Sequence, residues 1–217
     1  MLGFDWRPHG HTADIDRPFD YGQLGDDIAA LIKYLGYETA DVLGYSLGGG
    51  VALQTAIRHP ELVRKLTVIS APYKRTGWVP EVLAGMGTIS GEAMIGAPMH
   101  QASVEVAPRQ EDWLHLADKT RQLLSHDYNW TDEIAAIKAP TLLISGDADS
   151  IAPAHMAEMF ALLGGGKMDA GWDGAARPAS QLAVLARATP YNILYRTDLL
   201  LPVLRPFLDA PLSATAG

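Results

Sequence analysis

The stretch ADVLGYSLGGG at residues 40–50 decides the fold of this chain. It starts as a short apolar segment, passes through a glycine-flanked turn that carries Ser46, and leads into residues 51–59, which we expect to be helical. In this order of strand, turn and helix, the pattern G-x-S-x-G is typical of a nucleophile elbow, which exposes a serine hydroxyl above a sheet. The alternative, a glycine-rich loop with an incidental serine, explains the order of elements less well.

Each position around Ser46 has a chemical reason. Side chains at Gly44 and Gly48 would collide with the neighbouring strand and helix, so the strained turn needs small residues there. The N–H of Leu47 opens a helix, where backbone donors lack intrahelical partners and can receive a developing oxyanion. We therefore predict Ser46 as the nucleophile, the Leu47 N–H as an oxyanion donor, and Tyr45 as a residue of the substrate pocket.

The remaining chain alternates between expected strands and helices, which predicts an α/β fold with a parallel sheet flanked by helices. We assign this core to residues 1–71 and 139–217. The expected strands cover residues 41–45, 66–70, 141–145 and 181–185, and the expected helices cover residues 21–35, 51–59, 154–163 and 191–208.

Residues 72–138 interrupt the alternation and are rich in Gly, Pro, Trp and Met. This composition, with expected helices near 79–86, 110–125 and 131–137, predicts a small helical cap. Three methionines of the cap, Met86, Met94 and Met99, either line an adaptable apolar substrate pocket or simply pack the core of the cap.

Composition limits the class of partner. The formal charge of −8 and the isoelectric point near 5.3 argue against nucleic acid and anionic membrane surfaces. The chain has no cysteine, which excludes disulfides and thiolate metal sites and fits the cytoplasm. The first residues lack the charged and apolar regions of a signal peptide, and no apolar run reaches transmembrane length. We expect a cytoplasmic protein without a metal or cofactor.

A serine nucleophile needs a base, and the base needs an orienting acid. Asp147 and Asp149 both follow the expected strand 141–145, at the carboxyl end where sites of parallel sheets are built. We favour Asp149 as the acid, and the alternative is Asp147, which is closer to the strand and suited to capping a turn. His155 is the nearest histidine in sequence, but a histidine at the start of a helix is more often exposed or capping than catalytic.

With these motifs the chain resembles the α/β-hydrolase family, in particular its small-molecule esterase and lactonase-like members. The resemblance implies a reaction through an acyl-serine on Ser46, with Asp149 as the acid, a small ester or lactone as the substrate, and no cofactor. It extends from about Asp5 to Pro211 and rests on DWRPHGH at 5–11, GYSLGG at 44–49, HPELV at 59–63, APT at 139–141, GDAD at 146–149 and PYNIL at 190–194.

The catalytic histidine of the family falls between the last strand and the last helix. Here that loop covers residues 187–191, and Pro190 stands at the histidine position. Loss of the serine or the histidine from such a triad lowers kcat by roughly 10⁶. The sequence therefore predicts weak or absent hydrolase activity, with a non-catalytic pseudo-hydrolase that binds a small molecule or a partner as the alternative.

The family also has several strands before the loop that matches residues 5–11. We therefore expect an N-terminally truncated sheet in which strand 41–45 lies at an edge, and a fragment of a gene is a third interpretation. An apolar edge strand carries unpaired backbone groups that invite another chain. Self-association through strand 41–45 is expected on this ground.

Overall fold

The computed structural model describes residues 3, 17–86, 88 and 90–212 of the chain. Its centre is a four-stranded sheet in the order β1-β2-β3-β4, in which all three neighbouring pairs are parallel. This confirms the predicted α/β architecture. The strands are β1 (Ala40–Tyr45), β2 (Val63–Ile69), β3 (Thr141–Gly146) and β4 (Gln181–Leu185).

Eight α-helices lie among the described residues, and four of them were expected from the alternation with the strands. These four are α1 (Tyr21–Tyr34), α2 (Leu47–Arg58), α7 (Pro153–Leu162) and α8 (Thr197–Asp209). The segment between β2 and β3 contains the other four, α3 (Pro80–Met86), α4 (Pro98–Val106), α5 (Asp112–Ser125) and α6 (Thr131–Ala136).

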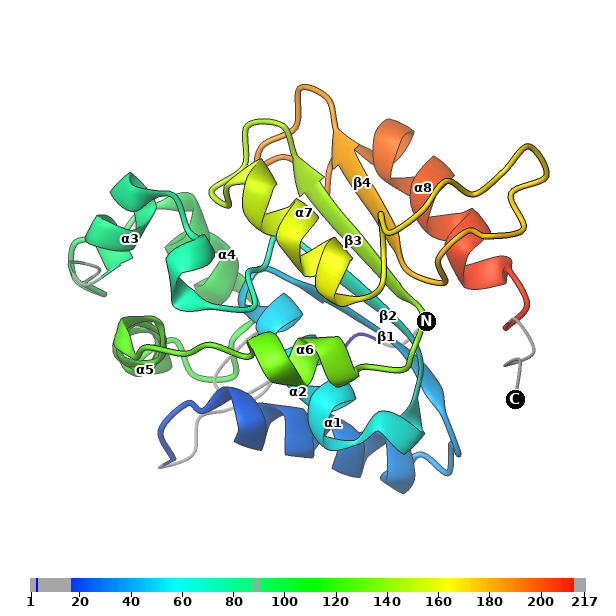
Figure 1. Ribbon diagram of the computed structural model, residues 1–217. Coiled ribbons are helices and arrows are strands. Elements are labelled where there is room, and N and C mark those ends of the chain that lie inside the picture. Colours follow the sequence, from blue (N-terminus) through cyan, green and yellow to red (C-terminus); the bar gives the residue numbers. More distant parts are fainter. Residues whose placement is uncertain (1–2, 4–16, 87, 89, 213–217) are drawn as a thin grey trace.

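The sheet is covered on both faces, with α8 on one face and α2, α6 and α7 on the other (Figure 1). Along β3, the side chains of Leu142 and Ile144 join the cluster that contains α8, whereas Leu143 joins the cluster beneath α2 and α7. All three are fully buried. Burial on both faces explains why the parallel strands are continuous apolar runs in the sequence.

A buried lysine fastens the end of α8 to the sheet. Lys65 on β2 is 2% exposed, and its Nζ donates to the carbonyl oxygens of Phe207 (2.7 Å), Leu208 (2.8 Å) and Ala210. The last carbonyls of a helix have no intrahelical donor and carry partial negative charge. The ammonium group satisfies three carbonyls at this helix end.

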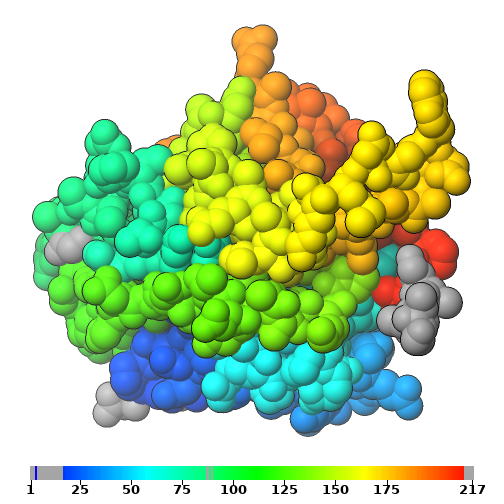
Figure 2. Space-filling view, viewed as in Figure 1, coloured from blue at the N-terminus to red at the C-terminus, as the bar shows by residue number. Residues whose placement is uncertain are grey.

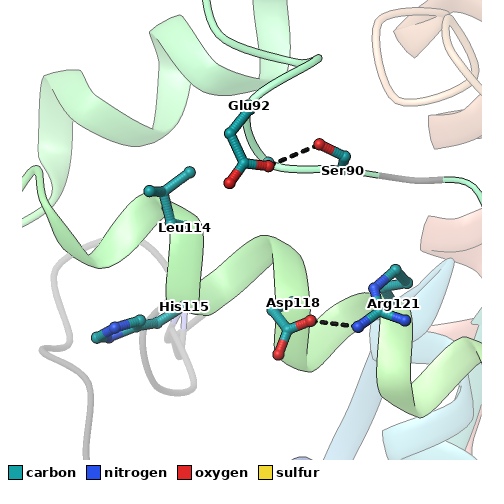
Figure 3. A pocket seen from close by; sticks show the side chains of 7 residues that line it. Ser90, Glu92, Leu114, His115, Asp118 and Arg121 are labelled. Carbon is teal, nitrogen blue, oxygen red and sulfur yellow. Dashed lines mark hydrogen bonds and ion pairs between the residues drawn. The ribbon is translucent and has the colours of Figure 1, made fainter.

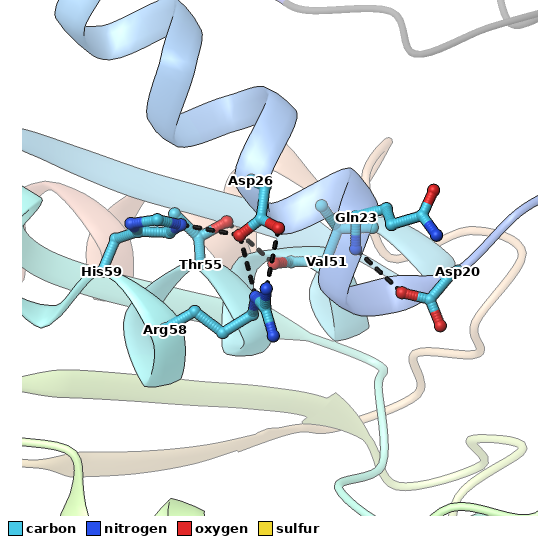
Figure 4. A network of polar contacts seen from close by, with 7 residues as sticks. All are labelled: Asp20, Gln23, Asp26, Val51, Thr55, Arg58 and His59. Carbon is cyan, nitrogen blue, oxygen red and sulfur yellow. Dashed lines mark hydrogen bonds and ion pairs between the residues drawn. The ribbon is translucent and has the colours of Figure 1, made fainter.

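Helix α1 packs on the outside of α2. The contact is close, because a Cβ at Gly50 would lie 2.5 Å from the ring of Tyr21. Asp26 on α1 joins the two helices by polar contacts: its carboxylate accepts two hydrogen bonds from Arg58, both 2.8 Å, and lies 2.7 Å from His59 Nε2 (Figure 4). Hydrogen bonds from Arg58 and His59 lower the pKa of Asp26 to about 2.

Helices α3 to α5 lie beside the layered core, whereas α6 belongs to it (Figure 1). Ile134 of α6 is fully buried in the cluster that contains α2 and α7. In the space-filling view, the green part of this segment runs between the blue residues of α1 and the yellow residues of α7 (Figure 2). A cap over residues 72–138 stays a proposal, and the packing of α6 favours a cap that ends before this helix.

Three helices differ from the sequence-based expectation, and one of them is α2, which begins at Leu47 rather than at residue 51. The helix expected at 191–208 begins only at Thr197, because the chain forms turns in which Asn192 Oδ1 accepts from the Thr189 N–H (2.9 Å). Pro202 lies inside α8, whose apolar face is buried on the sheet. Helix α4 was not expected, and none of its residues is buried.

Strand β1 is the edge of the sheet among the described residues and pairs only with β2. Its Leu43 side chain is 44% exposed. The loop at 5–11 and the segment 1–5, apart from Gly3, lie outside the described residues. No helix in the described part of the chain has the length and apolar character that crossing a bilayer requires.

Candidate functional site

The turn at residues 44–48, called the elbow below, holds Ser46 in an unusual backbone conformation. Ser46 has φ 52° and ψ −123°, and its N–H donates to the Ile69 carbonyl over 2.8 Å. A Cβ at Gly44 would lie 2.0 Å from the Gly48 carbonyl oxygen, so the approach between strand and helix requires glycine. Positive φ in a residue other than glycine costs on the order of 1–3 kcal/mol and is concentrated at functional sites.

The backbone donor predicted for an oxyanion lies at the start of α2. The Ser46 carbonyl accepts hydrogen bonds from the Gly49 N–H (2.9 Å) and the Gly50 N–H (3.3 Å). The Leu47 N–H, by contrast, donates to no acceptor in the described part of the chain. It is therefore available to an anionic oxygen at the elbow, and its role as oxyanion donor stays a prediction.

The carboxylate of Asp149 is held by two hydrogen bonds on one oxygen. Its Oδ2 accepts from Ser70 Oγ (2.6 Å) and from the Gly146 N–H (3.0 Å). Its Oδ1 is buried and has no hydrogen-bond partner among the described residues. Asp147 is exposed, and its backbone N–H donates to Leu185 O (3.1 Å). This geometry favours Asp149 over Asp147 as an orienting acid.

Ser70 is a site residue that the sequence analysis did not identify. It directly follows β2, is 1% exposed, and has φ 50°. The available signal was its position, since a polar residue just after a buried parallel strand stands at the carboxyl edge where sites are built. Ser70 thus orients the Asp149 carboxylate from the strand between β1 and β3.

Pro190 lies in the turn after β4, and its carbonyl oxygen accepts a hydrogen bond from the Tyr45 hydroxyl. The tyrosine beside Ser46 therefore reaches the turn in which the family carries its base. Burial raises the pKa of Tyr45, and the nearby Asp149 carboxylate and the hydroxyls of Tyr191 and Tyr195 raise it further.

No described histidine hydrogen-bonds to Ser46 or Asp149. His9 and His11 lie outside the described residues. The others have different surroundings: His59 contacts Asp26, His100 stacks edge-on against Trp113, His115 lines a pocket in the segment 72–138, His126 contacts Gln122 O, and His155 packs against Tyr73.

The position of His155 at a helix start had led us to expect an exposed or capping side chain. The structure instead buries it. Its ring stacks on Tyr73 at a centroid distance of 4.4 Å, and Nε2 accepts the Tyr73 N–H over 3.3 Å. Burial lowers the pKa of His155 to about 4, with a further lowering by Lys74 that Glu158 partly opposes. The side chain therefore joins α7 to the segment after β2 and is no base for Ser46.

The three methionines predicted for the substrate pocket have different surroundings, and their role in a pocket stays a prediction. Met86 is buried at the end of α3, and Met94 packs against the cluster of Trp113, Leu116 and Ala117 on α5. Both thus have the packing role that the sequence had left open. Met99 is 64% exposed, because α4 buries none of its residues.

A pocket of about 430 Å³ lies between α5 and the loop before α4 (Figure 3). Its polar groups pair with one another, since Ser90 Oγ donates to Glu92 over 2.7 Å and Arg121 pairs with Asp118. No group of three candidate metal ligands occurs in the part of the chain that the structure describes. This pocket contains none of the predicted site residues.

Comparison with known proteins gives the family context. A family model described as alpha/beta hydrolase fold matches residues 1–90. An AB hydrolase superfamily protein of Bacillus subtilis is 29% identical over 73% of this chain and 67% of its own length. A pimeloyl-[acyl-carrier protein] methyl ester esterase of Neisseria meningitidis is 31% identical over 69% of this chain and 64% of its own length.

Other relatives align over less of their length, such as an ethanol acetyltransferase of Eremothecium cymbalariae, of which the chain spans 19%. Among solved structures, the enol-lactonase from Burkholderia xenovorans is 20% identical and aligns over 94% of this chain and 78% of its own, with a TM-score of 0.63. The sheet, the elbow and these matches agree on an alpha/beta hydrolase fold for this chain, and its sequence is similar to members of that family.

Proposed function

We propose that this protein is a serine hydrolase that acts on a small ester or lactone through an acyl-Ser46 intermediate, with weak activity. The observation that carries the proposal is the elbow, which holds Ser46 at positive φ directly before the Leu47 N–H, for which the described residues supply no acceptor. Strain of this kind persists only where the surrounding structure imposes it, and it is common at reactive residues. Two similar proteins, a methyl ester esterase and an enol-lactonase, support the substrate class.

The residues have distinct roles in this mechanism. Ser46 Oγ attacks the carbonyl carbon, and the Leu47 N–H binds the oxygen that becomes negatively charged. The bond to the leaving oxygen breaks, this oxygen takes up through solvent the proton that Ser46 Oγ has lost, and water then hydrolyses the acyl-serine and returns a proton to Oγ. Asp149 would orient and stabilise a base, but the turn after β4 presents Pro190 there, which accepts the Tyr45 hydroxyl and has no proton-accepting nitrogen. Activity is weak for this reason.

A non-catalytic binding module is the second candidate, and the Tyr45–Pro190 hydrogen bond favours it. This contact fills the base position with a stable turn. A cytoplasmic location, the absence of a cofactor, and self-association through β1 are further parts of the proposal that rest on the sequence. The two candidates differ in whether Ser46 reacts.

Covalent labelling separates the candidates. A fluorophosphonate probe should label the protein slowly, and Ser46→Ala should abolish the label while the protein stays folded by circular dichroism. Pro190→His should raise hydrolysis of p-nitrophenyl acetate above the parent chain, and Pro190→Ala, which opens the same turn without adding a base, should not. Labelling at other residues with none at Ser46, together with no gain in folded Pro190→His, would support the binding module and refute the hydrolase.

A further inference from the structure

Residues 189–196, between β4 and α8, form two turns with the hydrogen-bond spacing of an α-helix. The Ile193 N–H donates to Thr189 O over 3.0 Å, and the Arg196 N–H donates to Asn192 O over 3.1 Å. Ile193 is fully buried in the cluster that contains α8, so its side chain fixes this segment to the sheet. We call residues 189–196 the anchored turn.

Three large side chains of the anchored turn are exposed, although the turn itself is fixed. Tyr191 is 81% exposed, Leu194 is 42% exposed and Tyr195 is 84% exposed. In a backbone of helical spacing, residues three and four positions apart lie on the same side. The three side chains therefore share one surface, opposite the buried Ile193, which we call the tyrosine face. Apolar side chains that gather in solvent on one fixed segment suit a binding surface.

Two hydrogen bonds attach the anchored turn and the residue before it to the candidate site. The Tyr45 hydroxyl donates to Pro190 O, and the Ala148 N–H donates to Ala188 O over 3.2 Å. The predicted nucleophile is the residue that follows Tyr45, and the predicted acid is the residue that follows Ala148. The tyrosine face begins one residue after Pro190, so it stands beside the elbow at the carboxyl edge of the sheet.

The backbone that leads into the anchored turn is tightly packed and strained. A Cβ at Gly146 would lie 2.1 Å from Ala188 O, so the end of β3 and this loop meet without a side chain between them. Arg187 has φ 57°, and its carbonyl accepts a hydrogen bond from Arg196 Nη1 over 3.2 Å. Strain of this kind persists only where the surrounding structure imposes it, and it clusters at functional sites. The fold therefore sets the position of the tyrosine face.

We propose that the tyrosine face binds the apolar part of the ester, and that the protein prefers esters that carry an aryl group. The inference rests on the proposed function and names its substrate class. Residues at i and i+4 of a helical turn have Cβ atoms about 6 Å apart, so the rings of Tyr191 and Tyr195 can both contact a single aryl ring. Aromatic pairs attract each other beyond the burial of their area, and the tyrosine hydroxyls stay in water at the rim. Leu194 adds an aliphatic contact on the same side.

Binding is tested on the full chain by ¹H–¹⁵N NMR with acetophenone, an aryl ketone that resembles an aryl ester but cannot be hydrolysed. Cyclohexyl methyl ketone is the matched compound, because it has a similar size but no aromatic ring. The amides of residues 191–195 should shift and saturate with acetophenone at lower concentration than with the cyclohexyl compound. Tyr191→Ala and Tyr195→Ala should each weaken the affinity for acetophenone by roughly three- to tenfold. Tyr34→Ala, which removes a ring that is 87% exposed on α1, should not. Equal affinities for the two ketones, or shifts confined to other residues, overturn the proposal without any variant having to fold.

The second readout is the rate at which Ser46 reacts with two fluorophosphonates, one with a phenyl and one with an ethyl substituent. The ratio of the phenyl rate to the ethyl rate should fall by roughly tenfold in the double variant Tyr191→Ala/Tyr195→Ala. Tyr34→Ala/Tyr37→Ala, which removes two exposed rings outside the anchored turn, should keep the ratio of the parent chain. An unchanged ratio in the first double variant overturns the inference and leaves the proposed function standing. No label at Ser46 with either compound contradicts the proposed function, whereas the NMR affinities still decide whether the tyrosine face binds the aryl group.

Discussion

Acid should destabilise this protein through His155 in a way that a single substitution isolates. The ring is 5% exposed, and its environment lowers the pKa from 6.5 to about 4. Burial is the main cause, Lys74 adds to it, and Glu158, whose carboxylate lies 4.0 Å from Nδ1, opposes it. The folded protein therefore keeps this histidine neutral under conditions in which an unfolded chain protonates it.

The sign and size follow from these two pKa values. Above pH 6.5 both states are neutral at His155, and the histidine contributes its full stabilisation. As the pH falls toward 4, the unfolded chain gains a proton that the folded protein does not, so the contribution is lost progressively. Between pH 7.5 and pH 4.5 the linkage relation gives a loss of about 2.5 kcal/mol in the free energy of unfolding.

Urea unfolding followed by tryptophan fluorescence measures this loss, and His155→Phe provides the reference. Phenylalanine keeps the stacking on Tyr73 but cannot titrate. It also leaves the Tyr73 N–H without its acceptor, so we expect the variant to be less stable by about 1–3 kcal/mol at pH 7.5. Other titrating groups are common to both proteins and cancel in the difference. Parallel pH dependences, within about 0.5 kcal/mol, would refute the reasoning.

Two further outcomes follow from other parts of the fold. Lys65→Met should lower the free energy of unfolding by about 2–3 kcal/mol, because three carbonyls at the end of α8 lose their donor; an unchanged urea midpoint would contradict the role of this contact. If the edge of β1 mediates self-association, Leu43→Lys should shift the protein toward monomer in light scattering, and Leu114→Lys, at a similarly exposed site on α5, should not. Val42 is unsuitable for this test because it packs against the core. A monomeric parent protein would rule the association out.

The fold was largely predictable because burial dictates its sequence pattern. The apolar runs at 141–145 and 181–185 match β3 and β4 to within one residue. Strand β2 begins at Val63, earlier than expected. The polar residues Arg64 and Lys65 interrupt the apolar pattern, so the start of the strand could not be recognised from the sequence. In the structure, Arg64 pairs with Asp41 at the surface, and Lys65 is buried under α8. Local composition cannot reveal such long-range partners.

For the candidate site, too, the sequence predicted the residues of local motifs but not the contacts between distant residues. Ser46 and Asp149 were identified from motifs that lie within a few residues of sequence. The contacts between Ser70 and Asp149 and between Tyr45 and Pro190 join residues 79 and 145 positions apart, so only the folded chain brings them together. Helix α4 escaped notice because it buries nothing, although Pro98 at its first position is a recognised helix start.

The sequential strand order also has a consequence for how the protein is made. Each strand pairs with the one synthesised just before it, so β1, α2 and β2 can assemble while the later chain is still being translated. The far edge of β2 then stays open until residues 70–140 have emerged and β3 arrives. Closing a connection of that length costs little more than closing a shorter one. The rate of translation sets the time for which β2 lacks its partner β3. During this time the nascent chain exposes an apolar strand edge that a chaperone would have to cover.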